Sequence, residues 1–226
     1  GGGRLVWVSG MCWALMFTAF MVALTLTSVA NVLLTMALGP MVTALFARVF
    51  LKQQLPRRTW GAIFVAATGI AWMFGGQAAE GVSLLGSLVA AIVPLAGSVN
   101  LTVLQRVSTQ GEAAPDMLPA ILIGALISAF FALPLAWPLA TSAHDLAWLA
   151  LLGIVQLAIP CLLMVRLSKQ LGAPEIALLA LLEVIFGVAW AWLGAGERPS
   201  GNVMIGGGLV LLALLANEAL ALRRSS

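Results

Sequence analysis

Residues 29–51 read VANVLLTMALGPMVTALFARVFL and contain one charged side chain, Arg48. A helix needs about 20 mostly apolar residues to cross about 30 Å of hydrocarbon, so this run is long enough for one crossing. Its apolar residues do not alternate with polar ones, as they would in the strands of a membrane barrel. The stretch therefore predicts a membrane-spanning helix.

The whole chain has the same character. Of its 226 residues, 62% are hydrophobic and 8% are charged, whereas a soluble domain has about 45–50% and 25%. Too few polar side chains remain to cover a surface in water. The net charge of +3 also provides no basic face for nucleic acid. The composition argues against a soluble enzyme and a nucleic-acid-binding protein, and it predicts the lipid bilayer as a partner.

Eight apolar runs lie between glycine, proline and charged residues. They cover residues 5–26, 29–51, 59–75, 82–107, 117–139, 146–167, 174–193 and 203–222. Only Thr27 and Ser28 separate the first two runs, and the third run is short. The expected fold is an all-α, polytopic membrane helix bundle with about eight transmembrane helices.

The distribution of Lys and Arg tests this count. If the helices alternate in direction, ten of the eleven basic residues fall on the side of the N-terminus, and Arg198 falls on the other. The ten are Arg4, Arg48, Lys52, Arg57, Arg58, Arg106, Arg166, Lys169, Arg223 and Arg224. Basic residues concentrate on the cytoplasmic side. We therefore expect a multi-pass protein of the bacterial inner (plasma) membrane with both termini in the cytoplasm.

Most tryptophans lie near the ends of the runs, where aromatic side chains anchor a helix at the membrane interface. These are Trp7, Trp60, Trp137, Trp148, Trp190 and Trp192. This pattern assigns no tryptophan to solute binding.

A shift of 144 residues superposes the second and third runs on the seventh and eighth. Each pair consists of an apolar run, a short polar loop and a glycine-rich run, with the loops at residues 52–57 and 196–201. The two loops fall on opposite sides of the membrane, so the repeats are inverted. Inverted repeats place a solute site near the midplane and allow alternating access.

Small and polar residues recur at every fourth position of the second run: Asn31, Thr35, Gly39, Thr43 and Ala47. Residues four apart share one face of a helix. Lipid does not favour such a face, so it is expected to pack on protein or to border a cavity.

Glu183 lies near the middle of the seventh run. A charge there costs about 2.5–3.5 kcal/mol on insertion scales, so the carboxyl is expected to be protonated, paired or turned toward water. One interpretation is proton coupling or binding of a cationic or amine-bearing solute. The other is structural: the carboxyl hydrogen-bonds backbone freed at a neighbouring helix break.

Other polar residues and prolines also lie inside the runs. Asn100 and Gln156 suit hydrogen bonds between helices, and facing a common cavity is the alternative. Pro40, Pro94 and Pro160 each remove one backbone hydrogen bond and predict a kink.

The sequence contains no motif that indicates an enzyme. The single histidine, His144, and the distant Cys12 and Cys161 do not suit a zinc site. Neither a Gly-x-Ser-x-Gly elbow nor a His-Glu-x-x-His pair is present. We expect neither catalysis nor a metal or cofactor.

Several short segments together resemble a known family. Residues 26–30 (LTSVA) lead into residues 38–42 (LGPMV), and residues 171–174 (LGAP) lead into residues 182–185 (LEVI). The second copy closes with GERP at residues 196–199 and IGG at residues 205–207. These patterns resemble the EamA-type transporters of the drug/metabolite transporter superfamily.

The resemblance implies two inverted five-helix repeats, ten helices in all, around a central cavity. Residues 1–77 would be a partial first repeat of three helices, and residues 78–226 a second repeat of five. Two leading helices would be absent, and the start at Gly1 without Met favours a natural N-terminus further upstream.

The resemblance also implies which residues line the cavity: Glu183, Thr35, Pro40, Asn100 and Gln156. Two positions depart from the family pattern. Gln53 stands where an acidic residue is common, and Val184 stands where Pro is usual after the glutamate.

The leading hypothesis is a secondary transporter that exports a small metabolite such as an amino acid by alternating access. Its expected partners are the bilayer and a small-molecule metabolite, without nucleic acid, and a homo-oligomer is compatible with the sequence. The alternative is a truncated, non-transporting membrane fragment or scaffold that needs partner helices.

Overall fold

The computed structural model describes residues 2–50, 54–79, 84–108, 114–138, 141–167, 173–196 and 199–222. Within these ranges the regular structure is helical throughout. The helices are α1 (Gly2–Leu26), α2 (Val29–Met36), α3 (Gly39–Phe50), α4 (Arg57–Ala79), α5 (Leu85–Ser108), α6 (Leu118–Leu135), α7 (Ala143–Leu152), η2 (Gly153–Ala158), α8 (Ile159–Leu167), α9 (Ala173–Ala195) and α10 (Gly201–Leu222).

These helices confirm the all-α membrane bundle. Five segments of the described chain are long and apolar enough to cross a membrane: Gly3–Leu26, Val29–Phe50, Arg57–Gly76, Leu85–Ser108 and Ala143–Leu167. Three shorter apolar helices, Leu118–Pro134, Leu182–Gly194 and Gly201–Asn217, lie at the other runs. The third run is longer than expected, since α4 extends from Arg57 to Ala79.

The boundary between the first two runs lies where the sequence places it. Helix α1 ends at Leu26, and Ser28 caps α2 in an extended conformation. The Ser28 hydroxyl accepts a hydrogen bond from the Asn31 backbone N–H at 3.3 Å, as an N-cap does. Two polar residues are therefore enough to end one membrane helix and begin another.

Two of the apolar runs are interrupted at a proline. Helices α2 and α3 are separated by a turn at Ala37 and Leu38, and Pro40 is the second residue of α3. Pro160 is the second residue of α8 and follows the π-helix η2. Each proline lacks the N–H that would continue the helical ladder. Pro94 also lies inside a helix, but α5 continues past it.

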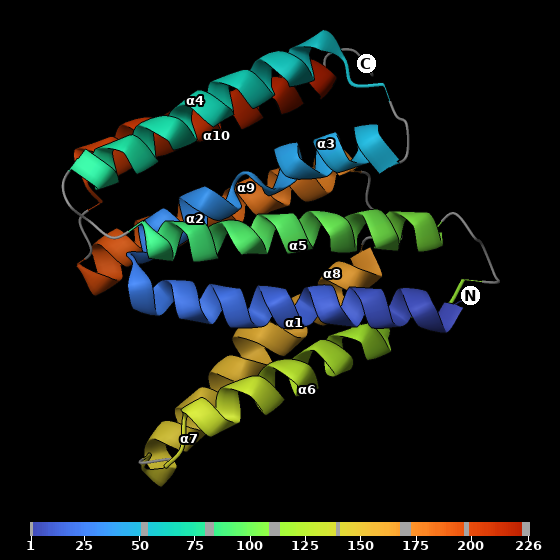
Figure 1. Cartoon of the computed structure of the whole chain (residues 1–226). Helices are drawn as coiled ribbons and strands as arrows, with labels where there is room; N and C mark the ends of the chain where they lie inside the picture. The colour runs from blue at the N-terminus through green and yellow to red at the C-terminus, as the bar shows by residue number, and fades with distance from the viewer. Residues whose placement is uncertain are drawn as a thin grey trace.

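The helices form stacked layers (Figure 1). Helix α4 lies beside α10 at the top of the view, and α2 packs against α9 in the next layer. Helix α5 contacts α1, α2 and α3, and α1 also packs against α6. The segment α7–η2–α8 runs from α7 at the lower edge of the view up to α8 near α1, and α6 makes contact with α8.

The same offset that relates the repeats in the sequence relates helix boundaries in the structure. Helices α2 and α9 begin at Val29 and Ala173, and α4 and α10 begin at Arg57 and Gly201, so each pair is 144 residues apart. The members of each pair also pack against one another.

The α4–α10 contact depends on two glycines. A methyl group added at Gly69 would meet the carbonyl oxygen of Gly206, and one added at Gly206 would meet that of Gly69 and the side chain of Met73. Because glycine has no side chain, the two membrane helices can approach this closely and their backbones pack against each other.

Gly206→Ala is therefore expected to lower the free energy of unfolding by about 1–3 kcal/mol, the usual effect of overpacking. Thermal denaturation of the purified protein in detergent measures this change. The matched control is Gly208→Ala on the same helix, since nothing lies within 4 Å of a methyl group there. Equal melting temperatures for the two variants would contradict this account.

Candidate functional site

Helix α5 presents buried polar side chains to three neighbouring segments. Ser87, Ser98 and Asn100 are each at most 1% exposed. Ser87 accepts a hydrogen bond from the Asn31 side-chain amide at 2.7 Å. Asn100 accepts one from the Ser9 hydroxyl of α1 at 2.6 Å. The polar face of α5 therefore packs on protein, as the small-residue pattern of α2 and α3 also does.

Ser98 lies beside the break between α2 and α3. It accepts a hydrogen bond from the Thr43 hydroxyl at 3.0 Å, and its own hydroxyl lies 2.6 Å from the Pro94 carbonyl and 3.3 Å from the Gly39 carbonyl. A serine hydroxyl has one proton, so these two acceptors share it. Ser98 thereby supplies a partner to backbone near two prolines.

Three of the five residues implied as cavity lining lie in this packed region. Thr35 is fully buried, and its hydroxyl donates to the Asn31 carbonyl of its own helix at 2.8 Å. Asn100 is buried with Ser9 as its partner. Pro40 is half-buried in the first turn of α3. In this conformation Thr35 and Asn100 act as packing groups.

The other two residues are exposed. Gln156 lies in η2, where none of the residues is buried, and Glu183 lies in α9. A π-helical turn inside an α-helix is often found at functional sites. The structure therefore separates the five residues into a buried set on α2, α3 and α5 and an exposed set on η2 and α9.

Glu183 has neither a hydrogen bond nor an ion pair with any described residue. Its neighbour Val184 is buried in the cluster with α2, α4 and α10, and Gly187 lies against Leu33. The Glu183 side chain itself is exposed, although Val184 beside it is buried.

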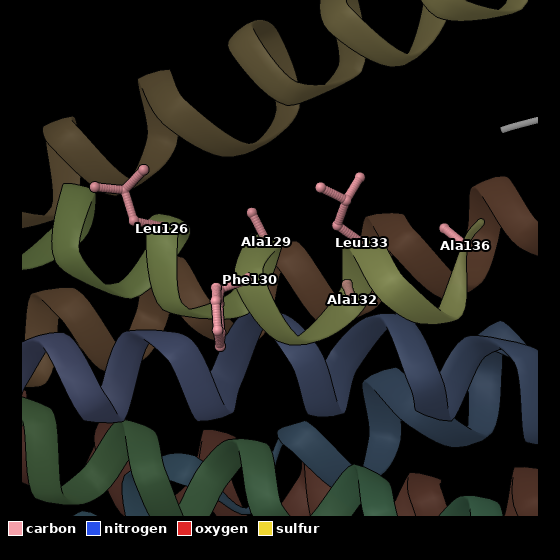
Figure 2. A pocket seen from close by; sticks show the side chains of 6 residues that line it. All are labelled: Leu126, Ala129, Phe130, Ala132, Leu133 and Ala136. Carbon is pink, nitrogen blue, oxygen red and sulfur yellow. The ribbon is translucent and has the colours of Figure 1, made fainter. Parts of the chain in front are cut away.

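A shallow hollow of about 370 Å³ runs along α6 and is lined by Leu126, Ala129, Phe130, Ala132, Leu133 and Ala136. Figure 2 shows the Leu126, Ala129 and Leu133 side chains on the side away from α1, whereas Phe130 points toward α1. The lining offers no polar side chain to orient a solute. It suits lipid, and the implied cavity residues are not part of it.

Two features of the site were not anticipated in the sequence. Ser9 and Ser87 each hydrogen-bond a side chain far away in the sequence, so their role depends on which helices meet. Periodicity identified the small and polar face of α2 and α3 but not its partners. Among the described residues no group of three or more His, Cys, Asp and Glu side chains suits a metal ion.

Apolar helices of this length, packed through small and polar faces, define a polytopic α-helical membrane protein. The model of the EamA-like transporter family matches residues 4–75 and 82–217, and the chain belongs to this family. Membership makes it a membrane transporter protein, which acts on small molecules from within the bilayer.

The chain is also similar to individual proteins. It is 21% identical over 218 residues to the pseudopaline exporter CntI of Pseudomonas aeruginosa strain UCBPP-PA14, a match that covers 95% of this chain and 75% of the exporter. The exporter of strain PAO1 gives the same identity and coverage. A solved crystal structure matches with a TM-score of 0.61 and 23% identity over 98% of this chain and 78% of that chain, which supports the fold.

The Ser9–Asn100 hydrogen bond can be tested as a packing contact between α1 and α5. We expect Asn100→Ala and Ser9→Ala each to destabilise the protein by about 1–3 kcal/mol, because each leaves a buried polar partner unpaired. A double-mutant cycle in detergent should give a coupling free energy of about 1 kcal/mol. A coupling of zero would show that the two side chains do not stabilise the α1–α5 contact together.

Proposed function

We propose that this chain is a secondary transporter that moves a small metabolite such as an amino acid out of a bacterial cell by alternating access. The relatives that it matches are named as exporters, which supports outward transport. The observation that carries the proposal is Glu183, an acidic residue within an apolar helix and without a described partner.

An unpaired carboxylate in a membrane helix is unfavourable unless water or a cation reaches it. The structural interpretation of Glu183 requires a hydrogen bond to backbone freed at a helix break, and the described residues provide none. The exposed carboxylate on α9 suits a solute ammonium group or a transferred proton. Gln156, exposed on the π-helical turn, is the second polar residue proposed to face this path.

The inverted-repeat arrangement supports alternating access. We propose a division into residues 1–77 and residues 78–226, with α2–α3 and α9, and α4 and α10, as equivalent pairs. Equivalent helices that pack on each other are expected close to a two-fold axis. Two halves related in this way can rock about a solute held between them.

The proposed membrane is the bacterial inner membrane, with both termini in the cytoplasm. The described basic residues support this orientation. Arg4, Arg57, Arg58, Arg106 and Arg166 all lie toward the helix ends assigned to one side. This side would be the cytoplasm under the positive-inside rule.

Glu183→Gln is expected to reduce transport about tenfold or more, since a charge-assisted hydrogen bond contributes about 1.5–3 kcal/mol and each 1.4 kcal/mol is a factor of ten. Counterflow of a metabolite panel in proteoliposomes measures the rate, and expression should remain normal. The matched control is Asp116→Asn, whose carboxylate is exposed and accepts the Leu118 backbone N–H. Equal rates and equal pH dependence for Glu183→Gln and the unmodified chain would support the structural role.

The orientation can be tested by cysteine labelling. Ser142→Cys should react with a membrane-impermeant maleimide added to intact cells, because Ser142 caps α7 at the end opposite the basic residues. Ser108→Cys, at the exposed end of α5, should react only after permeabilisation. Cys12 and Cys161 are buried, so their background labelling should be low. The reverse labelling pattern would invert the topology.

A second candidate is a membrane scaffold that becomes active only with partner helices. It is favoured by the segment α7–η2–α8, in which α7 and η2 have no buried residues, whereas α1 packs against both α5 and α6. If α1 and this segment are equivalent, counterparts of α5 and α6 are expected to cover it.

Counterflow separates the two candidates when the chain is compared with a version extended upstream by two helices. Transport by the chain alone would contradict the scaffold. Transport only by the extended version would favour the scaffold. If neither moves any solute of a broad metabolite panel, the transporter proposal is wrong.

A further inference from the structure

Helix α4 has two faces of different character. The face that packs on α10 contains Thr59, Ala62, Ala66, Gly69 and Met73, all of them buried. Side chains on the opposite face are exposed, and Figure 1 shows α4 at the upper edge of the molecule with α10 beside it. The described part of the chain therefore leaves one long side of α4 uncovered by protein.

Exposed aromatic side chains lie on this uncovered side. Trp60 and Phe64 are four residues apart, so they share one face of the helix, and they are 49% and 75% exposed. Gly61 lies between them in the sequence, and a methyl group added there would meet nothing within 4 Å. One turn further, the Thr68 hydroxyl donates to the Phe64 carbonyl at 2.9 Å, so its proton is satisfied within the helix. These four residues form an apolar surface, the aromatic face of α4.

Two arginines stand directly before the aromatic face. Arg57 begins α4, is exposed and lies on the same side of the helix as Trp60. Arg58 is held in place, because its Nη1 donates to the Leu220 carbonyl near the end of α10 at 2.6 Å. The Arg58 Nε is buried without a partner among the described residues, and the Trp13 indole Nε1 is the other such donor. Neither arginine forms an ion pair with a described acidic side chain, so two positive charges at this end of α4 are uncompensated.

The spacing of these groups matches one leaflet of a bilayer. A helix rises about 1.5 Å per residue, so Phe64 lies about 10 Å and Thr68 about 16 Å from Arg57 along the axis. The hydrocarbon of one leaflet is about 15 Å deep, half of about 30 Å. An amphiphile whose head lies at Arg57 therefore has its tail alongside Trp60 and Phe64.

We propose that this side of α4 binds an anionic phospholipid, with its headgroup against Arg57 and Arg58 and one acyl chain along the aromatic face. Basic residues beside a membrane helix attract anionic lipid, whereas they repel the ammonium group of a zwitterionic lipid. A soluble anion would use the arginines and leave the aromatic face uncovered. Charge and apolar surface thus select the same partner. This site is separate from the transport function proposed above, and its test does not depend on that function.

The simpler interpretation is that Arg57 and Arg58 only orient the protein and that Trp60 only anchors α4 at the interface. Under that interpretation α4 contacts every phospholipid equally, and its arginines do not differ from a single arginine elsewhere on the same side of the membrane. Arg166 is such a residue, since it is exposed near the end of α8 and the residues one turn before it are leucines.

Native mass spectrometry of the purified full chain in detergent measures the affinity for each added lipid. Dioleoylphosphatidylglycerol is anionic, and dioleoylphosphatidylcholine has the same acyl chains with a zwitterionic headgroup. Glycerol 3-phosphate carries the anionic group without acyl chains. Arg57→Gln removes one charge, and Arg166→Gln is the matched control. Gly61→Leu fills the open space on the aromatic face, and Gly75→Leu is its control on the same helix, since a methyl group at Gly75 also meets nothing within 4 Å.

The unmodified chain should bind the phosphatidylglycerol at least about fivefold more tightly than the phosphatidylcholine. Each arginine near an anionic headgroup contributes about 1 kcal/mol, which is a factor of about five in affinity. Arg57→Gln should lose about fivefold in affinity for phosphatidylglycerol and none for phosphatidylcholine, which also shows that the variant is folded. Arg166→Gln should bind both lipids as the unmodified chain does. Gly61→Leu should bind both phospholipids more weakly than Gly75→Leu.

Equal affinity of the unmodified chain for the two phospholipids would overturn the proposal. An equal loss in Arg57→Gln and Arg166→Gln would also overturn it, because it would indicate a general effect of net charge. Displacement of phosphatidylglycerol by an equal concentration of glycerol 3-phosphate would indicate a site for a free anion in place of a lipid. Unchanged binding in Gly61→Leu would show that no acyl chain lies along α4.

Discussion

Helix α5 holds the bundle together through polar contacts that lipid cannot replace. Its buried Ser87, Ser98 and Asn100 meet Asn31, Thr43 and Ser9 from three other segments. In hydrocarbon an unpaired polar group has no water to bind, so each such pair favours one arrangement of helices over its alternatives. The positions of α1, α2 and α3 around α5 follow from these pairs together with the apolar packing of Ala23, Val32 and Ala90.

The interruptions of the helices depend on the same constraint. The turn at Ala37 and Leu38 frees backbone groups within an apolar run, and Ser98 of α5 supplies a hydroxyl near the Gly39 carbonyl. Irregular backbone at membrane depth is tolerated where protein covers it. The π-helical turn before Pro160 is different. Because η2 is exposed, its backbone N–H and C=O groups must find their hydrogen-bond partners within the helix itself. These two breaks therefore suit different roles, one in packing and one beside the proposed solute path.

Much of the fold follows from local sequence. Run length and the absence of alternation predict each crossing, and Thr27 and Ser28 predict the end of α1 because Ser28 is a good N-cap. Pro40 predicts the break at the start of α3, although its unbroken counterpart Pro94 shows that a proline alone is not sufficient. Local sequence predicts the candidate site less well than it predicts the fold. Asn100 looks the same in the sequence whether it lines a cavity or pairs with Ser9, which lies 91 residues away.

The sequence by itself determined the solvent of this protein, its all-helical membrane character and the asymmetry of its basic residues, because lipid acts on each segment separately. The tertiary structure alone decided which polar groups have partners. Thr35 and Asn100 became packing groups, whereas Glu183 and the Trp13 indole were left without a described acceptor or cation. The physical reason is that a hydrogen bond depends on the positions of two helices, and no property of one helix specifies where the other will lie.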